Sequence, residues 1–178
     1  MRLPADIEIL ATASMDGLRF HLTPPDMPLA ETDLLAAPSP LAAICLRLAA
    51  TLLAKVSEPA RSSSGIILGT RHGCLRTDID FDQSRREAAG RFASPGAFRG
   101  TLPSAIPSEL SVRLGTKGPI LVVLEDADFI ALALSRAFVW MRRFPMEYCI
   151  AGGFDWPPDF APQGTFHLLR FKGINGSS

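Results

Sequence analysis

A short, strongly β-prone run leads directly into an apolar helix, and this pair limits the folds open to the chain. Gly118-Pro119 introduces Ile120, Leu121, Val122, Val123 and Leu124, whose branched and apolar side chains favour a buried strand. Residues 126–143 follow with helical spacing and apolar residues nearly all round, which indicates a buried helix. A strand and helix of this kind are typical of α/β proteins, so we expect 120–124 to be the central strand.

Strand and helix signals alternate along the rest of the chain. Further strands are predicted at 7–13, 66–68, 148–151 and 165–171, with a short one at 18–22, and helices at 41–56, at 77–92 and, for a turn or two, at 109–114. Ser39 with Pro40 marks a helix start, and the last two strands resemble an antiparallel hairpin. The predicted fold class is therefore α/β, with a mostly parallel five-stranded sheet and helices on both faces.

Length and composition favour a single folded unit. The 178 residues are 47% apolar, so we expect residues 1–178 to form a single domain. Five prolines fall within residues 23–40, which predicts a proline-rich linker inside that domain. No apolar run approaches the ~20 residues that a bilayer span needs, and Cys45, Cys74 and Cys149 lack C-x-x-C spacing. These features predict a soluble, cytoplasmic protein without a targeting segment.

Charge and motif patterns exclude several classes of function. Eighteen basic residues balance eighteen acidic ones, which argues against a nucleic-acid or membrane partner. The phosphate-binding glycine motifs are missing, so no nucleotide cofactor is expected. The three histidines His21, His72 and His167 lack metal-ligand spacing, so no metal site is predicted. A nucleophile is formally available as Cys74 or a serine beside His72, although a loop thiol and a loop imidazole are the favoured explanation of the pair.

Charged residues near the apolar helix have two interpretations. Glu125, Asp126 and Asp128 stand at its start, where Asp126 is the predicted helix cap. The same carboxylates could serve as paired acids in general acid/base catalysis. The arginine pairs Arg85-Arg86 and Arg142-Arg143 could dock an acidic carrier protein, and the second pair also suits a helix C-terminus.

Four short segments, in this order, resemble the N-terminal half of a β-ketoacyl-ACP synthase. They are Ser64–Thr70 (SGIILGT), Ser94–Ala105 (SPGAFRGTLPSA), Arg113–Pro119 (RLGTKGP) and Ile150–Gly153 (IAGG). The resemblance covers about residues 40–156 and implies one half of a thiolase-like fold. It also implies a dimer in which the strand Ile120–Leu124 pairs across a two-fold axis.

The resemblance breaks down at the catalytic residues. The family's nucleophilic cysteine stands eight residues after the proline of the Gly-Pro pair, and here that position is Ala127. The half that carries the family's catalytic histidines is not found before Ser178. If the alignment holds, condensation is excluded, and whether any other catalysis remains is open.

Synthase relatives that lack the cysteine are chain length factors, which pair with an active synthase and shape its acyl tunnel. The chain is similar to the short chain-length-factor-like proteins of aryl polyene pathways in Arg71-His72-Gly73 and in Glu125-Asp126 followed by Phe129. By this resemblance the loop with Gly96, Ala97 and Phe98 reaches the partner's acyl pocket. A plain Gly/Pro turn with Phe98 packed inside is the alternative.

Three functions remain after this reading. The first is a non-catalytic subunit of fatty-acid or polyketide biosynthesis that pairs with a full-length synthase or with itself and also meets an acyl carrier protein. The second is a small acyl-thioester enzyme that uses Asp126, Asp128 or His72. The third is a homodimeric scaffold that binds no acyl chain.

Overall fold

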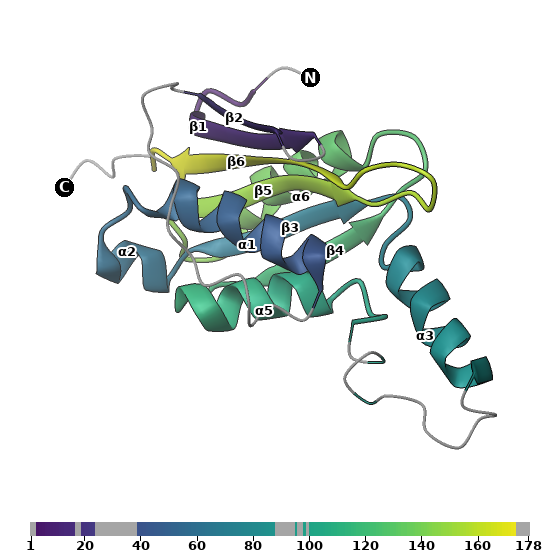
Figure 1. Cartoon of the computed structure of the whole chain (residues 1–178). Helices are drawn as coiled ribbons and strands as arrows, with labels where there is room; N and C mark the ends of the chain where they lie inside the picture. The colour runs from purple at the N-terminus through teal and green to yellow at the C-terminus, as the bar shows by residue number, and fades with distance from the viewer. Residues whose placement is uncertain are drawn as a thin grey trace.

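A six-stranded mixed sheet forms the centre of the protein in the computed structural model, which describes residues 3–16, 19–23, 39–87, 95, 98 and 100–173 (Figure 1). The strand order is β2-β1-β6-β5-β3-β4. The strands are β1 (Ile7–Asp16), β2 (Arg19–Thr23), β3 (Gly65–Thr70), β4 (Ile120–Leu124), β5 (Tyr148–Asp155) and β6 (Gln163–Phe171). Most of the predicted linker, residues 24–38, lies outside the described residues.

The α/β class with helices on both faces is confirmed, but the sheet has six strands rather than five and is less parallel than predicted. Two strand pairs are parallel, β3 with β4 and β3 with β5. The pairs β1–β2, β1–β6 and β5–β6 are antiparallel. No helix separates β1 from β2 or β5 from β6, and such short connections join antiparallel strands.

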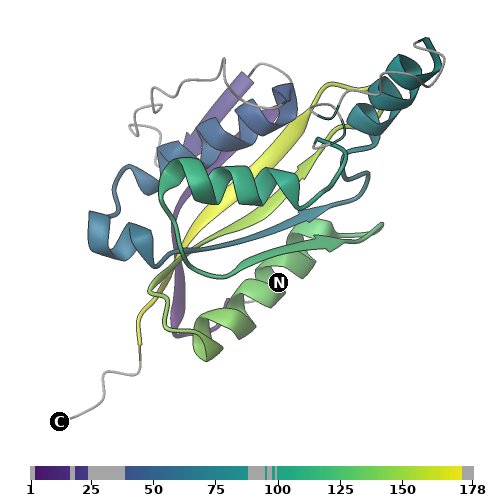
Figure 2. The same cartoon turned by 90° about the horizontal axis from the view of Figure 1, so that it is seen from below.

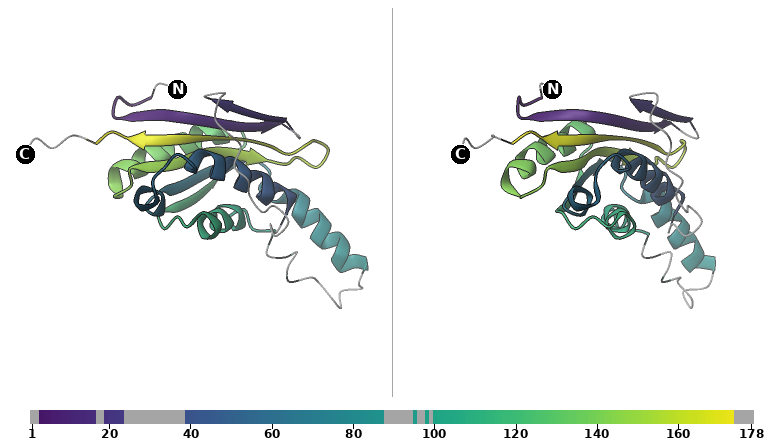
Figure 3. Two further views of the ribbon diagram at one scale, coloured as in Figure 1. Left: turned by 60° about the vertical axis from the view of Figure 1, so that its left-hand side comes forward. Right: turned by 90° about the vertical axis from the view of Figure 1, so that its left-hand side faces the viewer.

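Helices cover the sheet unequally. α1 (Pro40–Leu53) and α5 (Ala105–Leu114) lie on one face, and α6 (Phe129–Arg143) lies on the other (Figure 2). The Ser39 hydroxyl accepts the Ala42 N–H at 3.1 Å, so the predicted cap of the first helix is confirmed. Two further helices are α2 (Glu58–Ser62), which the sequence reading missed, and α3 (Leu75–Glu87). α3 buries none of its residues and projects from the body of the protein (Figure 3).

The predicted central strand is an edge strand instead. β4 pairs with β3 alone among the described strands, and Ile120 and Leu124 are 38% and 60% exposed. The two middle positions belong to β6 and β5, and the strands buried almost throughout are β3 and β5. β5 also continues through Gly152-Gly153, where the sequence reading ended it, because both glycines pair with β6.

The prediction that the α6 segment is buried all round is wrong as well. Its buried residues, Ala133, Leu134, Ala137, Phe138 and Met141, form one face. Arg136 and Val139 are exposed on the other side. The helix therefore rests on the sheet by a stripe and leaves its outer side uncovered.

Two glycines let α6 start close to the sheet. A Cβ atom at Gly69 would stand 2.1 Å from the Phe129 carbonyl oxygen, and one at Gly153 would stand 2.5 Å from the Phe129 ring. Neither position could hold a larger residue without moving the helix. Glycines on β3 and β5 thus fix the start of α6 at the carboxyl ends of these strands.

Candidate subunit interface and the turn beside it

The exposed edge of the sheet is formed by the apolar strand β4. Val122 packs against the core beneath α1 and α5, while Leu121 and Val123 pack against the core beneath α6. The outer hydrogen-bonding side of β4 meets no other strand among the described residues. An apolar edge of this kind is a template for pairing with another chain. Its place agrees with the sequence-based choice of residues 120–124 as an interface, although the pairing itself stays a prediction.

The turn after β3 is held by a buried carboxylate. Asp155, only 2% exposed, accepts the ring Nδ1 hydrogen bond of His72 at 2.7 Å and the His72 backbone N–H at 2.9 Å. The Thr70 hydroxyl donates to the same carboxylate at 3.3 Å and accepts the Gly73 N–H at 2.9 Å. The hydrogen bond from Nδ1 to Asp155 fixes the orientation of the His72 ring. The His72 side chain is partly exposed to solvent.

Ala127 stands beside this turn and just outside α6. Its carbonyl accepts a hydrogen bond from Arg71 at 3.3 Å, and its N–H donates to the Glu125 carboxylate at 3.2 Å. The position that the resemblance assigns to the nucleophile therefore carries an exposed methyl group before the helix cap. The Arg71-His72-Gly73 turn and the start of α6 are joined by a direct contact.

The acidic residues near α6 have separate roles. Asp128, not Asp126, caps the helix by accepting the Ala131 N–H at 2.9 Å. Asp126 is exposed. The structure thus corrects the predicted cap by two residues, because the helix begins at Phe129 rather than at 126.

Other predicted site residues are placed as follows. Phe98 is 55% exposed and packs on the Phe81 ring of α3, with 5.7 Å between centroids, so it is not inside the core. Gly96 and Ala97 lie outside the described residues. Arg142 forms a bidentate ion pair with Asp6, at 2.8 and 2.5 Å, so its charge is already compensated.

Asp155 is the residue that sequence reasoning missed. The only local signal was an acidic residue at the end of the buried run Tyr148–Asp155. Its partner His72 lies 83 positions earlier in the chain, so no short motif could join them.

The thiols are poor nucleophiles in this fold. Burial raises the pKa of Cys74 to about 11, with the nearby Asp78 carboxylate adding to the effect. Burial also raises the pKa of Cys45 and of Cys149 above the ordinary thiol value.

Within the described residues, no three His, Cys, Asp or Glu side chains are grouped closely enough to hold a metal ion. No helix in the same residues has the length and apolar character needed to cross a membrane.

The chain has a thiolase-like fold of the kind found in ketosynthases and chain length factors. No protein-family model matches the sequence, and a search of curated proteins found no match. Among solved structures, the chain is similar to the ketosynthase ApeO in complex with its chain length factor ApeC from Xenorhabdus doucetiae, with a TM-score of 0.73 and 12% identity. The alignment covers 97% of this chain and 81% of that one.

Two further structures support the same fold. The ishigamide ketosynthase/chain length factor aligns with a TM-score of 0.71 and 15% identity, over 98% of this chain and 64% of that one. A β-ketoacyl synthase from Burkholderia phymatum STM815 gives a TM-score of 0.68 and 10% identity, over 93% and 59%. The chain thus spans about three fifths of the length of these two relatives.

Proposed function

We propose that this protein is a non-catalytic ketosynthase-like subunit of fatty-acid or polyketide biosynthesis that pairs with an active ketosynthase. The observation that carries the proposal is the unpaired apolar edge β4, with Leu124 60% exposed. Two of the similar structures contain a ketosynthase and a chain length factor, which supports a synthase as the partner. Pairing with a second copy of this chain is the other form of the same proposal.

The residue at the aligned nucleophile position and the burial of Cys74 support a non-catalytic role. Ala127 cannot form a thioester, and burial suppresses the thiolate form of Cys74. We expect no condensation product from the purified chain with acyl and malonyl carrier proteins. A carrier-bound ketoacyl product would contradict this part of the proposal.

In the proposed complex, Phe98 contributes to the wall of the partner's acyl tunnel. The Phe98 ring packs on Phe81 of α3, and it is exposed and outside the core of its own chain. We expect Phe98→Ala to lengthen the products of the reconstituted pair and Ala97→Phe to shorten them, with the complex intact. An unchanged product length in both variants would remove the tunnel role and leave the pairing untouched.

The pairing is tested by purifying the tagged chain from its native source and identifying the bound proteins by mass spectrometry. We expect a full-length ketosynthase, and we expect Leu124→Asp to abolish its recovery because a charge would be desolvated at the contact. Val112→Asp is the matched control, since Val112 is an 81% exposed valine on α5 that lines a hollow with residues of α1 and α2. Equal recovery with both variants would contradict pairing through β4.

A second function, an acyl-thioester enzyme, is favoured by the His72–Asp155 pair. A carboxylate that holds Nδ1 leaves the other ring nitrogen available as a base. Asp128 is already engaged as the helix cap, which leaves His72 as the stronger candidate. Thioester turnover by the purified chain that is lost in His72→Gln would support this function, and the absence of turnover would exclude it.

A further inference from the structure

Four neighbouring strands place small and polar residues in one row on the α6 side of the sheet. Thr165 is the register partner of both Gly153 and Ser14, and Ser14 is in turn the partner of His21. Register partners in adjacent strands share a face, so this row runs across β5, β6, β1 and β2. In the next row, Gln163 of β6 faces Asp16 of β1.

This part of the sheet face is polar where the opposite face is apolar. Ala13 and Met15 of β1 and Phe166 of β6 are buried in the core beneath α1. The intervening residues Ser14 and Thr165 remain partly exposed. α6 packs mainly on β5 and β3, so the row continues beyond the helix into solvent.

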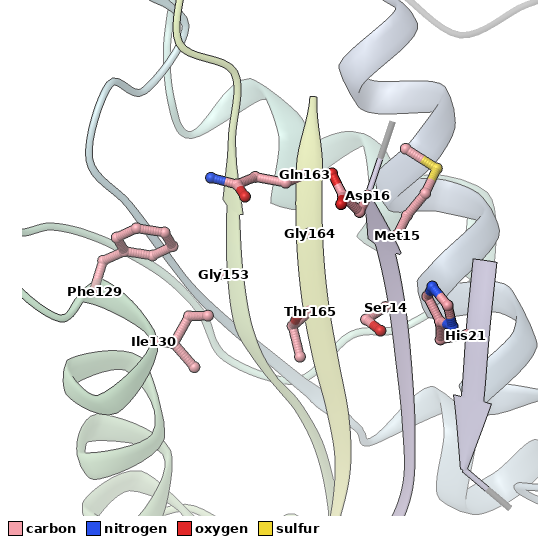
Figure 4. Close-up of a pocket in the computed structure, with 10 residues that line it drawn as sticks. All are labelled: Ser14, Met15, Asp16, His21, Phe129, Ile130, Gly153, Gln163, Gly164 and Thr165. Atoms are coloured by element: carbon pink, nitrogen blue, oxygen red, sulfur yellow. The ribbon is translucent and has the colours of Figure 1, made fainter. Parts of the chain in front are cut away.

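A cavity of about 350 Å³ lies where α6 begins beside this row. Phe129 and Ile130, from the first turn of α6, form its apolar side (Figure 4). The side chains of Ser14, Thr165 and His21 come from the strands across from them. Gly153 has no side chain, which lets the Phe129 ring and Ile130 lie directly against β5 at the apolar side of the cavity. A volume of this size is in the range of small-molecule pockets.

The residues that line the cavity indicate the charge of the ligand that it would prefer. Hydroxyl, amide and imidazole groups both donate and accept hydrogen bonds, and the Asp16 carboxylate accepts them. Among the described lining residues there is one carboxylate and no lysine or arginine, so an anion is disfavoured. Arg19, the register partner of Asp16, puts a positive charge on the neighbouring strand β2 and so reduces the preference for a cation.

We propose that this cavity binds a small uncharged molecule with a flat apolar face and an edge that both donates and accepts hydrogen bonds. The flat face lies against Phe129 and Ile130, and the polar edge meets Ser14, Thr165 and Gln163. The lining residues come from β1, β2, β5, β6 and α6 and not from the β4 edge, so the site stands apart from the proposed pairing.

The test is a titration of the full chain, followed by two-dimensional amide NMR, with benzamide, benzoate and acetamide as probes. Benzamide and benzoate have nearly the same shape and differ in charge, while acetamide lacks the flat face. We expect benzamide to shift the amides of Gly153, Ser14 and Thr165 with millimolar affinity. Benzoate and acetamide should bind at least about tenfold more weakly.

Two variants separate the cavity from the rest of the sheet face. Thr165→Leu fills the cavity and should weaken benzamide about tenfold, whereas Thr23→Leu, on the same face but outside the lining, should leave the affinity unchanged. Ser14→Ala removes one hydroxyl at a partly exposed position, so it should weaken binding even if the larger variant fails to fold. Equal binding of benzoate, unaltered affinity in Ser14→Ala, or no shift with benzamide would each overturn the proposal.

Discussion

At the scale of single residues, the carboxylate of Asp155 connects two parts of the chain that are far apart in sequence. It ends β5 and holds the turn Thr70–Gly73 at the end of β3. The turn in turn places Arg71 on the Ala127 carbonyl. One buried side chain therefore organises the surface beside the proposed interface.

Replacing this residue tests its structural importance. Asp155→Ala removes an acceptor from two buried or half-buried side chains and one backbone N–H, so it should lower the free energy of unfolding by about 3 kcal/mol. Asp159→Ala, at an exposed position a few residues on, should change it little. Chemical denaturation of both variants measures the difference, and equal stability would show that the carboxylate does not hold the turn.

At the scale of elements, the start of one helix is determined by neighbouring residues and the start of another by contacts between residues far apart in sequence. Ser39 and Pro40 are adjacent in sequence, and this pair was enough to predict the helix cap correctly. The start of α6 could not be located from sequence because Asp126 and Asp128 both satisfy the preference for aspartate as a helix cap. The close approach of Phe129 to Gly69 and Gly153, together with the Asp128 cap, fixes where that helix begins.

The assignment of Asp128 as the cap of α6 predicts how two aspartate substitutions change stability. Asp128→Ala should lower the free energy of unfolding by about 1 kcal/mol, because the Ala131 N–H loses its acceptor. Asp126→Ala should leave stability nearly unchanged, since that side chain is exposed and outside the helix. Thermal denaturation followed by circular dichroism compares the pair, and a larger loss in Asp126→Ala would restore the cap that the sequence suggested.

The edge position of β4 shows why strand order is harder to predict than strand identity. Its five apolar residues gave the correct strand limits. The same residues suggested a central strand, because composition reports burial on the two faces and not whether both hydrogen-bonding sides are paired. β5 became central instead, through partners in β3 and β6 that lie far from it in sequence.

At the scale of the whole molecule, helices cover the two faces of the sheet to different extents. One face carries α1 and α5 over an apolar core, and the other carries α6 over only part of its width. The uncovered part is polar, with Thr12, Ser14 and Thr165 among its residues. Because these side chains suit water, the fold does not require an apolar layer over this region.

The pair Asp6–Arg142 joins the residue before β1 to the last turn of α6 across the molecule. The hydrogen bond from Arg142 holds the pKa of Asp6 below its usual value. The unfolded carboxyl binds its proton more readily, so the pair stabilises the fold above about pH 4, and this stabilisation is lost as pH falls through the lower folded pKa.

Acid denaturation of the wild type and Asp6→Asn tests this pH dependence. The wild type should be the more stable near neutral pH, and the difference should vanish in strong acid. Because Arg142 is exposed and Asp6 is partly exposed, about 1 M salt should also reduce the difference. A difference in stability that is constant from neutral pH to strong acid would contradict the assigned pKa shift.

Pairing through β4 is tested most directly by amide hydrogen exchange of this chain, free and bound to the ketosynthase recovered with it. The two edges of the sheet provide an internal comparison, since β4 and β2 each have one unpaired side among the described strands. We expect exchange at Ile120–Leu124 to slow markedly in the complex while Arg19–Thr23 keeps its free rate. Protection of β2 with unchanged exchange in β4 would contradict the proposed interface.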